Sequence, residues 1–250
     1  MEFTYQPGQT PLDPDEKEGL KPKHISTQGE LNEWEQLNII KGARWAQRQL
    51  KQDVLDDVFL RKLHKQMFSD TWTWAGTYRK SDKNIGCDWR QVSMRVRNLL
   101  ENTKYQIEHN AMPPDELAAR FHHQLVLIHP FPNGNGRCCR LIADLLLQKM
   151  GLKPFTWGSG GHASLVSQSE MRAEYLAALR AADQGDISPL LAFARKSKMD
   201  NEGVSSIYKG AFSKFFTLIE SCSHSCFSNF PVRSFSEDKP VSDEIKRVIN

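Results

Sequence analysis

A histidine, a glycine-containing loop and two arginines meet where one apolar helix is predicted to end and another to begin. The stretch LIHPFPNGNGRCCRLIADLLLQKMG occupies residues 127–151. Pro130 disfavours helical geometry at the preceding residue, so the first helix is expected to stop at His129. Gly134 and Gly136 can adopt backbone conformations closed to other residues, and the second helix begins directly after them. This junction constrains the fold because the C-terminus of one helix must lie close to the N-terminus of the next helix.

The start of the second helix is predicted to be an anion site beside a base. N–H groups at a helix start have no partner within the helix, and loop amides add to them. Arg137 and Arg140, three residues apart, lie on adjacent parts of one helix face. His129, at a helix C-terminus, is expected to have a pKa near neutrality. This arrangement suits phosphoryl or nucleotidyl transfer, although a plain helix connector with a solvated arginine face has the same residues.

Apolar residues at steps of three or four predict helices along most of the chain. Thr27 and Glu30 form a capping box at the start of one of them, with Trp34, Leu37 and Ile40 on its apolar face. The stretch TWTWAGTYRKSDKNIGCDW, residues 71–89, instead favours a β-hairpin. The expected fold is therefore mainly α, a helical bundle with a small β-hairpin flap. The other segments with helical patterns are 56–68, 91–109, 113–130, 167–186 and 188–198.

Charge and composition exclude several classes of protein. The net charge is only +3, from 33 basic and 30 acidic residues, which does not suit a dedicated nucleic-acid binder. Five cysteines in 250 residues are too few for a disulfide scaffold. The N-terminal stretch is polar and acidic, unlike a signal peptide, and the apolar runs are too short to span a membrane. We expect a cytoplasmic protein that contacts neither membrane nor nucleic acid directly.

The stretch HPFPNGNGRCCR resembles the signature of the Fic family, H-P-F-x-D/E-G-N-G-R-x-x-R. WAGTYRKSDKNIG is similar to the flap of that family, and RAEYLAALRAADQGDISPLLAFAR to its final core helices. The N-terminal stretch GQTPLDPDEKEGLKPKHISTQGELNEWEQ looks most like the subgroup called mobile mystery protein B. The resemblance covers residues 7–198.

The resemblance implies an enzyme that transfers AMP from ATP to a Ser, Thr or Tyr hydroxyl of a target protein. His129 corresponds to the general base of the family, and Gly136 favours AMP transfer over the phosphate transfer of the Doc-like branch. The alternatives are removal of AMP, phosphotransfer, and a non-catalytic nucleotide-binding regulator. The residues that would hold the phosphates are Gly134, Asn135, Gly136, Arg137 and Arg140.

The flap is expected to bind the target. By the resemblance, the hairpin around Asn84, Ile85 and Gly86 would pair with an extended segment of the target protein through main-chain hydrogen bonds. An ordinary edge ribbon without a ligand has the same local sequence. The sequence identifies neither the target protein nor the oligomeric state.

One position departs from the family signature. The acidic residue that binds Mg²⁺ in the family is Asn133 in this chain. An amide oxygen is an acceptable but neutral ligand for a hard cation, so the loss of the carboxylate should weaken metal binding. Because ATP brings phosphate oxygens of its own, we expect a weaker Mg²⁺ requirement or a preference for Mn²⁺.

Two interpretations of Glu30 remain open. Many family members are restrained by a helix with the pattern S/T-x-x-x-E-G/N, whose glutamate pairs with the second arginine. Residues 26–30 fit this pattern, but Leu31 occupies the Gly/Asn position. Glu30 is therefore either an inhibitory residue or only the capping-box partner of Thr27.

The resemblance divides the chain into four parts. Residues 1–24 are predicted to be an N-terminal arm and residues 25–52 an N-terminal helix, which is inhibitory under one of the two interpretations of Glu30. Residues 53–198 would form the Fic-like catalytic domain. Residues 199–250 are rich in Ser and are expected to be a poorly ordered tail.

Overall fold

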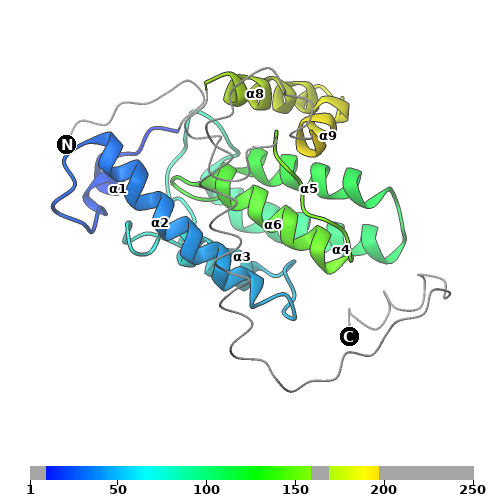
Figure 1. Cartoon of the computed structure of the whole chain (residues 1–250), viewed down its shortest axis with the longest axis horizontal. Helices are drawn as coiled ribbons and strands as arrows, with labels where there is room; N and C mark the ends of the chain where they lie inside the picture. The colour runs from blue at the N-terminus through cyan, green and yellow to red at the C-terminus, as the bar shows by residue number, and fades with distance from the viewer. Residues whose placement is uncertain (1–9, 159–168, 197–250) are drawn as a thin grey trace, which may run out of the picture. The chain divides into compact units, whose positions relative to one another are not determined.

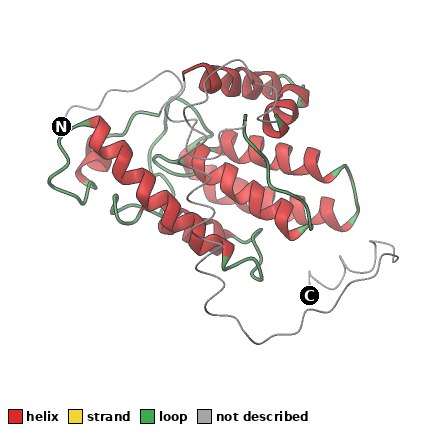
Figure 2. Cartoon of the chain, in the orientation of Figure 1, coloured by secondary structure: helices red, strands yellow, loops and turns green. Residues whose placement is uncertain are grey.

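The computed structural model describes residues 10–158 and 169–196, and this part of the chain is helical (Figures 1 and 2). Helices α5 and α6 lie side by side; α4 packs against α5, α2 against α3, and α8 against α9. No helix in these two ranges is long and apolar enough to cross a membrane. In chain order the helices are α1 (Pro14–Glu18), α2 (Gln28–Gln47), α3 (Asp57–Phe68), η1 (Trp89–Gln91), α4 (Val92–Glu108), α5 (Pro114–Ile128), α6 (Asn135–Lys149), α8 (Ser169–Asp183) and α9 (Ser188–Arg195).

Helices α5 and α6 form the centre of the bundle. Leu117, Phe121, Leu125 and Ile128 of α5 are all buried, as their spacing predicts. Helix α6 is buried on nearly every side, including Cys138 and Cys139, and burial raises the pKa of both thiols. A helix with so little exposed surface is fixed in position by its neighbours, so the residues at its N-terminus are fixed as well.

The apolar face predicted for α2 is confirmed at Trp34, which is partly buried against the core, and wrong at Leu37 and Ile40. The Leu37 side chain is 67% exposed and that of Ile40 is 41% exposed. The buried face of α2 carries two polar residues, Glu35 and Asn38, next to Leu31 and Ile39. Asn38 accepts a hydrogen bond from the Asp70 N–H (3.0 Å), so tertiary hydrogen bonds pull a polar stripe inward.

The β-hairpin predicted at residues 71–89 is also wrong. All of these residues are described; they form turns, bends and η1, with one isolated antiparallel bridge from Trp72 to Leu20. The buried guanidinium of Arg79 donates to the carbonyls of Ser81 (2.8 Å) and Cys87. These carbonyls would otherwise be available to a cross-strand ladder, so one side chain replaces the hairpin pairing.

The N-terminal segment packs against the rest of the molecule from residue 10 onward. Leu12 and Ile25 are buried, and Asp13 and Glu16 form a capping box at α1. Lys21 N–H donates to the Thr71 carbonyl at 2.9 Å, which ties the segment to the loop after α3. The tail predicted at residues 199–250 lies outside the part that the structure describes.

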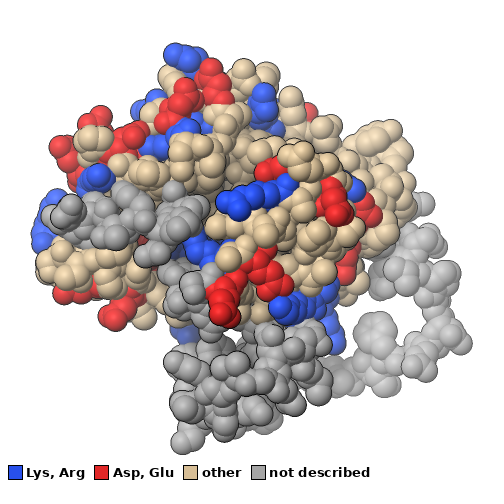
Figure 3. Space-filling model, turned by 90° about the horizontal axis from the view of Figure 1, so that it is seen from above, with Lys and Arg blue, Asp and Glu red and all other residues tan. Residues whose placement is uncertain are grey.

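Basic and acidic side chains are interspersed on the face shown in Figure 3, without a continuous stripe of one sign. The visible surface of this face therefore offers no extended anionic or cationic track.

Candidate active site

The α5–α6 junction bends sharply at two residues. Helix α5 ends at Ile128, as predicted, but His129 adopts the left-handed conformation (φ 55°, ψ 62°) rather than an extended one. Gly134 has φ 77°, and a Cβ there would lie 2.5 Å from the ring of Phe68. Only glycine fits this position without displacing a core aromatic. The left-handed His129 is a strained geometry that its surroundings must hold.

Two side chains, those of Asn135 and His64, shape the loop. Asn135 accepts from the Phe131 N–H (2.8 Å) and donates to the Phe131 carbonyl (2.7 Å), so its amide closes the loop on itself. His64 receives the Gly76 N–H on Nδ1 (3.0 Å), and its Nε2 therefore donates to the Asn133 carbonyl at 3.0 Å. Burial lowers the pKa of His64 to about 3, so this ring is neutral.

Arg79 holds the backbone of His129. Its Nε donates to the His129 carbonyl (2.7 Å), and its own N–H donates to the Pro130 carbonyl (2.9 Å). A Cβ at Gly86 would come within 2.9 Å of the Cβ of His129 and 2.8 Å of the Arg79 guanidinium. Arg79 and the close approach at Gly86 together keep His129 in its left-handed conformation.

The imidazole of His129 is buried and faces a threonine. Oγ1 of Thr10 lies 2.9 Å from Nε2 of His129. Burial lowers the pKa of His129 to about 4; the nearby Arg79 charge acts in the same direction, and a main-chain hydrogen bond at Val126 opposes both. The expected pKa near neutrality is therefore wrong, because burial outweighs the helix dipole. At neutral pH the ring is uncharged and able to accept a proton.

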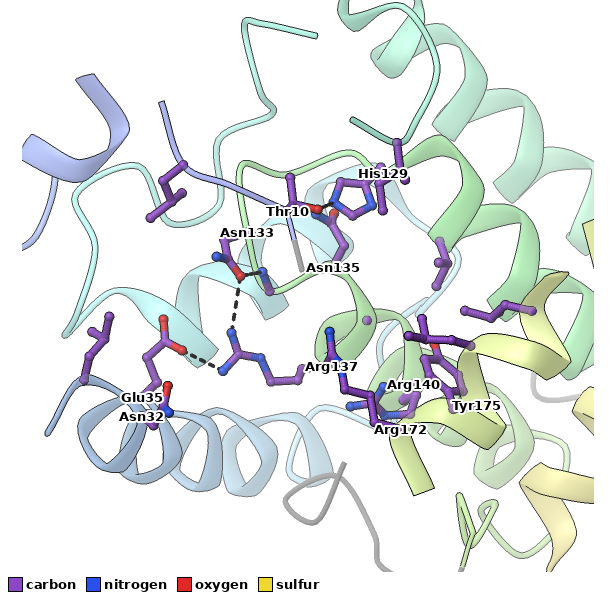
Figure 4. A pocket seen from close by; sticks show the side chains of 18 of the residues that line it. Thr10, Asn32, Glu35, His129, Asn133, Asn135, Arg137, Arg140, Arg172 and Tyr175 are labelled. Atoms are coloured by element: carbon purple, nitrogen blue, oxygen red, sulfur yellow. Dashed lines mark hydrogen bonds and ion pairs between the residues drawn. The ribbon is translucent and has the colours of Figure 1, made fainter. Parts of the chain in front are cut away.

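Arginine side chains line the opposite side of the same pocket (Figure 4). Arg140 is buried, its guanidinium lies 5.3 Å from the ring centroid of Tyr175, and its Nε has no hydrogen-bond partner in the described structure. Arg172 of α8 lines the pocket as well. Burial lowers the pKa of Arg140, and also that of Arg172, where the Arg140 charge adds to the effect. Guanidinium groups this close together create a strong preference for an anion.

The N–H groups at the start of α6 add to this anion site. Those of Asn135, Gly136 and Arg137 come before any carbonyl of the helix that could accept them. A Cβ at Gly136 would lie 3.4 Å from Nη1 of Arg140, so the glycine leaves the space between loop and arginine open. The helix start and the arginines therefore line one side of a single pocket.

A buried carboxylate, that of Glu35, forms an ion pair with one of the arginines. Oε2 of Glu35 lies 2.7 Å from Nη1 of Arg137, and Oε1 of Glu35 accepts from Nε1 of Trp72 at 2.7 Å. The Arg137 guanidinium also stacks on Phe68, 4.8 Å from the ring centroid. Arg137 is thus held by α2 in this structure, whereas Arg140 is not.

Asn133 is turned toward its own loop. Its Oδ1 accepts from the Gly134 N–H (2.5 Å) and lies 3.5 Å from Nη2 of Arg137. In residues 10–158 and 169–196 no group of three His, Cys, Asp or Glu side chains is arranged to hold a metal ion. The oxygen that Asn133 could offer to Mg²⁺ or Mn²⁺ is a neutral amide oxygen.

The pocket brings most of the predicted site residues together, but not all of them. His129, Asn133, Gly134, Asn135, Gly136, Arg137 and Arg140 line it. Ile85 of the predicted flap also lines it, whereas Gly86 packs behind His129 and Asn84 lies next to them in the same loop.

Glu30 does not reach the arginines. Its exposed carboxylate accepts hydrogen bonds from the N–H groups of Ser26 (2.8 Å) and Thr27 (3.0 Å), and these bonds lower its pKa. The capping box predicted for Thr27 and Glu30 is confirmed. The glutamate of α2 that does pair with an arginine is Glu35.

Sequence reasoning missed five residues of the site. Arg172, Glu35 and Thr10 line the pocket, while Arg79 and His64 support its walls. A signal existed for Glu35 and Asn38, since an (i, i+3) polar pair interrupts the apolar pattern of α2. No local pattern marks Thr10, because its partner is 119 residues away.

Comparison with known proteins agrees with this geometry. Residues 54–147 match the Fic/DOC family model. Over 86 residues the chain is 40% identical to protein adenylyltransferase fic-1 of Caenorhabditis briggsae, covering 34% of this chain and 15% of that protein. Over 133 residues it is 28% identical to protein adenylyltransferase fic-1 of Caenorhabditis elegans, covering 53% and 22%. The chain thus matches less than a quarter of the length of these relatives.

The fold is similar to that of solved Fic domains. One is the N-terminal Fic domain of a VirB-translocated Bep effector protein from Bartonella quintana, solved with bound ADP. The TM-score is 0.55 at 20% identity, over 71% of this chain and 90% of that one. Residues 54–147 are therefore similar to the Fic/DOC family domain, with distant similarity to protein adenylyltransferases. These matches do not distinguish a subgroup of the family.

Proposed function

We propose that this chain is a protein adenylyltransferase that transfers AMP from ATP to a hydroxyl group of a target protein. The observation that carries the proposal is a single pocket lined by a neutral, buried histidine, the N-terminus of α6 and three arginines. A base that can accept a proton and a cradle that can hold a triphosphate are the two requirements of this reaction.

In the proposed reaction His129 takes the proton from the target hydroxyl. The oxygen attacks the α-phosphorus, an O–P bond forms, and the bond from the α-phosphorus to the bridging oxygen breaks, so that pyrophosphate leaves. The N–H groups of Asn135 and Gly136 and the guanidinium of Arg140 stabilise the charge on the phosphates. Negative charge brought close to His129 by the nucleotide raises its pKa from about 4 and makes it a stronger base.

A divalent ion, when bound, neutralises charge on the phosphates. Asn133 is the residue we assign to it, through the amide oxygen that now accepts from the Gly134 N–H. The neutral amide oxygen of Asn133 would bind a hard cation less strongly than a carboxylate would. The predicted weak Mg²⁺ requirement, or preference for Mn²⁺, follows from this neutral ligand.

The same Asn133 geometry favours a second candidate, a nucleotide-binding regulator without transfer activity. In that protein the Oδ1 contacts to Gly134 and Arg137 persist when nucleotide is bound. Arg140 and Arg172 would still hold the phosphates, but His129 would have no reaction to perform.

Labelled ATP distinguishes the candidates. The chain is incubated with a cell lysate and ATP labelled on either the α- or the γ-phosphate, with His129→Ala as the control. Label from the α-phosphate on protein, absent with the control, is the expected result. Label from the γ-phosphate alone would indicate phosphotransfer, and saturable nucleotide binding without label would indicate the regulator.

A further inference from the structure

The N-terminal segment places the hydroxyl group of Thr10 within hydrogen-bonding distance of His129, the candidate base. Thr10 is buried, and its Oγ1 lies 2.9 Å from Nε2 of His129. When His129 carries its proton on Nδ1, Nε2 accepts a hydrogen bond from this hydroxyl. Threonine side chains in irregular segments ordinarily bond to their own main chain, whereas this one reaches across 119 residues.

The segment is held in this place by ion pairs to a buried lysine, Lys83. Nζ of Lys83 lies 2.7 Å from Oδ2 of Asp13 and 2.6 Å from Oε2 of Glu16, and the Lys83 side chain is 2% exposed. The Ser81 hydroxyl donates to Asp13 Oδ2 at 2.5 Å. These contacts, Lys83 first, lower the pKa of Asp13. Four polar groups therefore fix the chain three residues after Thr10.

Lys83 and Ser81 belong to the loop that was expected to bind the target. Leu12 and Thr10 line the pocket together with Ile85 of the same loop. Figure 4 shows Thr10 and His129 at one end of the pocket and Arg140 and Arg172 at the other. The N-terminal segment thus occupies the position of an acceptor peptide, with its hydroxyl next to the base and the anion site within the same pocket.

We propose that Thr10 is a self-modification site, an acceptor of AMP within the same chain. This inference rests on the proposed function. His129 Nε2 takes the proton of the Thr10 hydroxyl, Oγ1 bonds to the α-phosphorus of ATP, and the bond to the bridging oxygen breaks to release pyrophosphate. A reaction between groups already in contact avoids the cost of bringing two molecules together.

The first test is to locate AMP on the chain. The purified chain is incubated with ATP and Mn²⁺ or Mg²⁺, and intact mass and peptide mapping follow. One AMP is expected on the peptide that contains Thr10, in the wild type and in Thr10→Ser. It should be absent in Thr10→Val and His129→Ala, and unchanged in the matched control Thr77→Val, which alters an exposed threonine.

The second test asks whether the reaction is intramolecular. The initial rate per chain should stay constant as the protein is diluted, and a rate proportional to protein concentration would overturn the inference. Lys83→Met should slow labelling of Thr10 by roughly tenfold or more, because the local concentration of the hydroxyl at His129 falls. Lys80→Met, which removes an exposed lysine of the same loop, should not.

Failure of this inference and failure of the proposed function give different results. AMP on another residue, equal in wild type and Thr10→Val, overturns the Thr10 assignment and leaves the adenylyltransferase in place. So does α-label on lysate proteins with an unmodified Thr10 peptide. Absence of α-label from this chain and from every lysate protein overturns both.

Discussion

The two sides of the pocket are built from different parts of the chain. One side consists of the α6 N-terminus with Arg140, supported by Arg172 of α8. The other side comes from the N-terminal segment and α2, which contribute Thr10 and Glu35. The first side offers positive charge and N–H groups. The second side supplies two groups that contact the pocket: a hydroxyl that lies next to His129 and a carboxylate that pairs with Arg137.

This difference separates the groups that would bind the nucleotide from the groups that would restrain the reaction. The cationic side lies in the best packed part of the molecule, where α5 and α6 bury nearly all of their apolar residues. The covering side meets the cationic side through polar contacts such as Glu35 to Arg137. Changes on the cationic side should therefore abolish transfer, and changes on the covering side should tune it.

The largest effect is expected on the cationic side. Arg140→Ala should lower the rate of AMP transfer at least about a hundredfold, because it removes a buried donor aimed at the phosphates. Arg140→Lys keeps the charge but not the fork and should be intermediate. The measurement is initial α-label transfer, with the exposed Arg180→Ala as control. Equal rates for Arg140→Ala and Arg180→Ala would show that the phosphates do not bind on the cationic side of the pocket.

His129 contacts Thr10 of the covering side, and the burial of its imidazole predicts that the free energy of unfolding depends on pH. Its pKa is about 4 in the folded chain and near 6.5 when unfolded, so the unfolded chain binds more protons between these values. The free energy of unfolding should fall as pH drops from 6.5 toward 4, by at most about 1.4 kcal/mol per pH unit from this group.

Denaturant titrations from pH 7 to pH 4 measure this slope. His129→Asn should flatten it, whereas the exposed His109→Asn should leave it unchanged. His64, with a pKa of about 3, contributes in the same direction and remains in both variants. An unchanged slope in His129→Asn would show that the imidazole is not buried as described.

The metal requirement tests whether Asn133, in the loop between the two sides of the pocket, is a ligand of the metal ion. Asn133→Asp adds a carboxylate where Arg137 lies 3.5 Å away. The half-saturating metal concentration for transfer should fall by roughly tenfold, since a charged oxygen binds a hard cation more strongly. Titration of Mg²⁺ and Mn²⁺ measures it. If the metal dependence does not change, Asn133 is not a ligand.

A smaller effect, with the opposite sign from Arg140→Ala, is expected on the covering side. Glu35→Gln keeps the hydrogen bond from Trp72 but removes the charge that pairs with Arg137. Transfer should rise roughly fivefold, the low end of typical coupling between two sites. Glu30→Gln is the matched control on the same helix; a glutamine can still take part in the capping box with Thr27, and the variant should not raise transfer. A higher rate with Glu30→Gln alone would return the inhibitory role to Glu30.

The same division explains what the sequence predicted. The α5–α6 junction depends on local rules: Pro130 ends α5, Gly134 permits a left-handed turn, and the apolar pattern of α6 follows at once. These features lie within a few residues of one another. Their geometry could therefore be predicted, although the pKa of His129 could not, because burial depends on the whole fold.

The covering side depends on contacts between distant residues. The hairpin expected at residues 71–89 is replaced by the hydrogen bonds of Arg79, one of whose partners is His129, 50 residues away. Glu35 is buried on α2 because its partner is Arg137, 102 residues away. Local propensity does not encode either pair, so the sequence pattern placed Leu37 on the buried face and did not identify Glu35.

The most direct test of the central claim is a crystal structure with a non-hydrolysable ATP analogue. The account predicts the terminal phosphates against the N–H groups of Asn135 and Gly136 and the guanidinium of Arg140, with the α-phosphorus facing Nε2 of His129. The bond between Glu35 and Arg137 should be broken or lengthened. A nucleotide bound elsewhere, with the contact of Glu35 to Arg137 intact at saturating concentration, would contradict it.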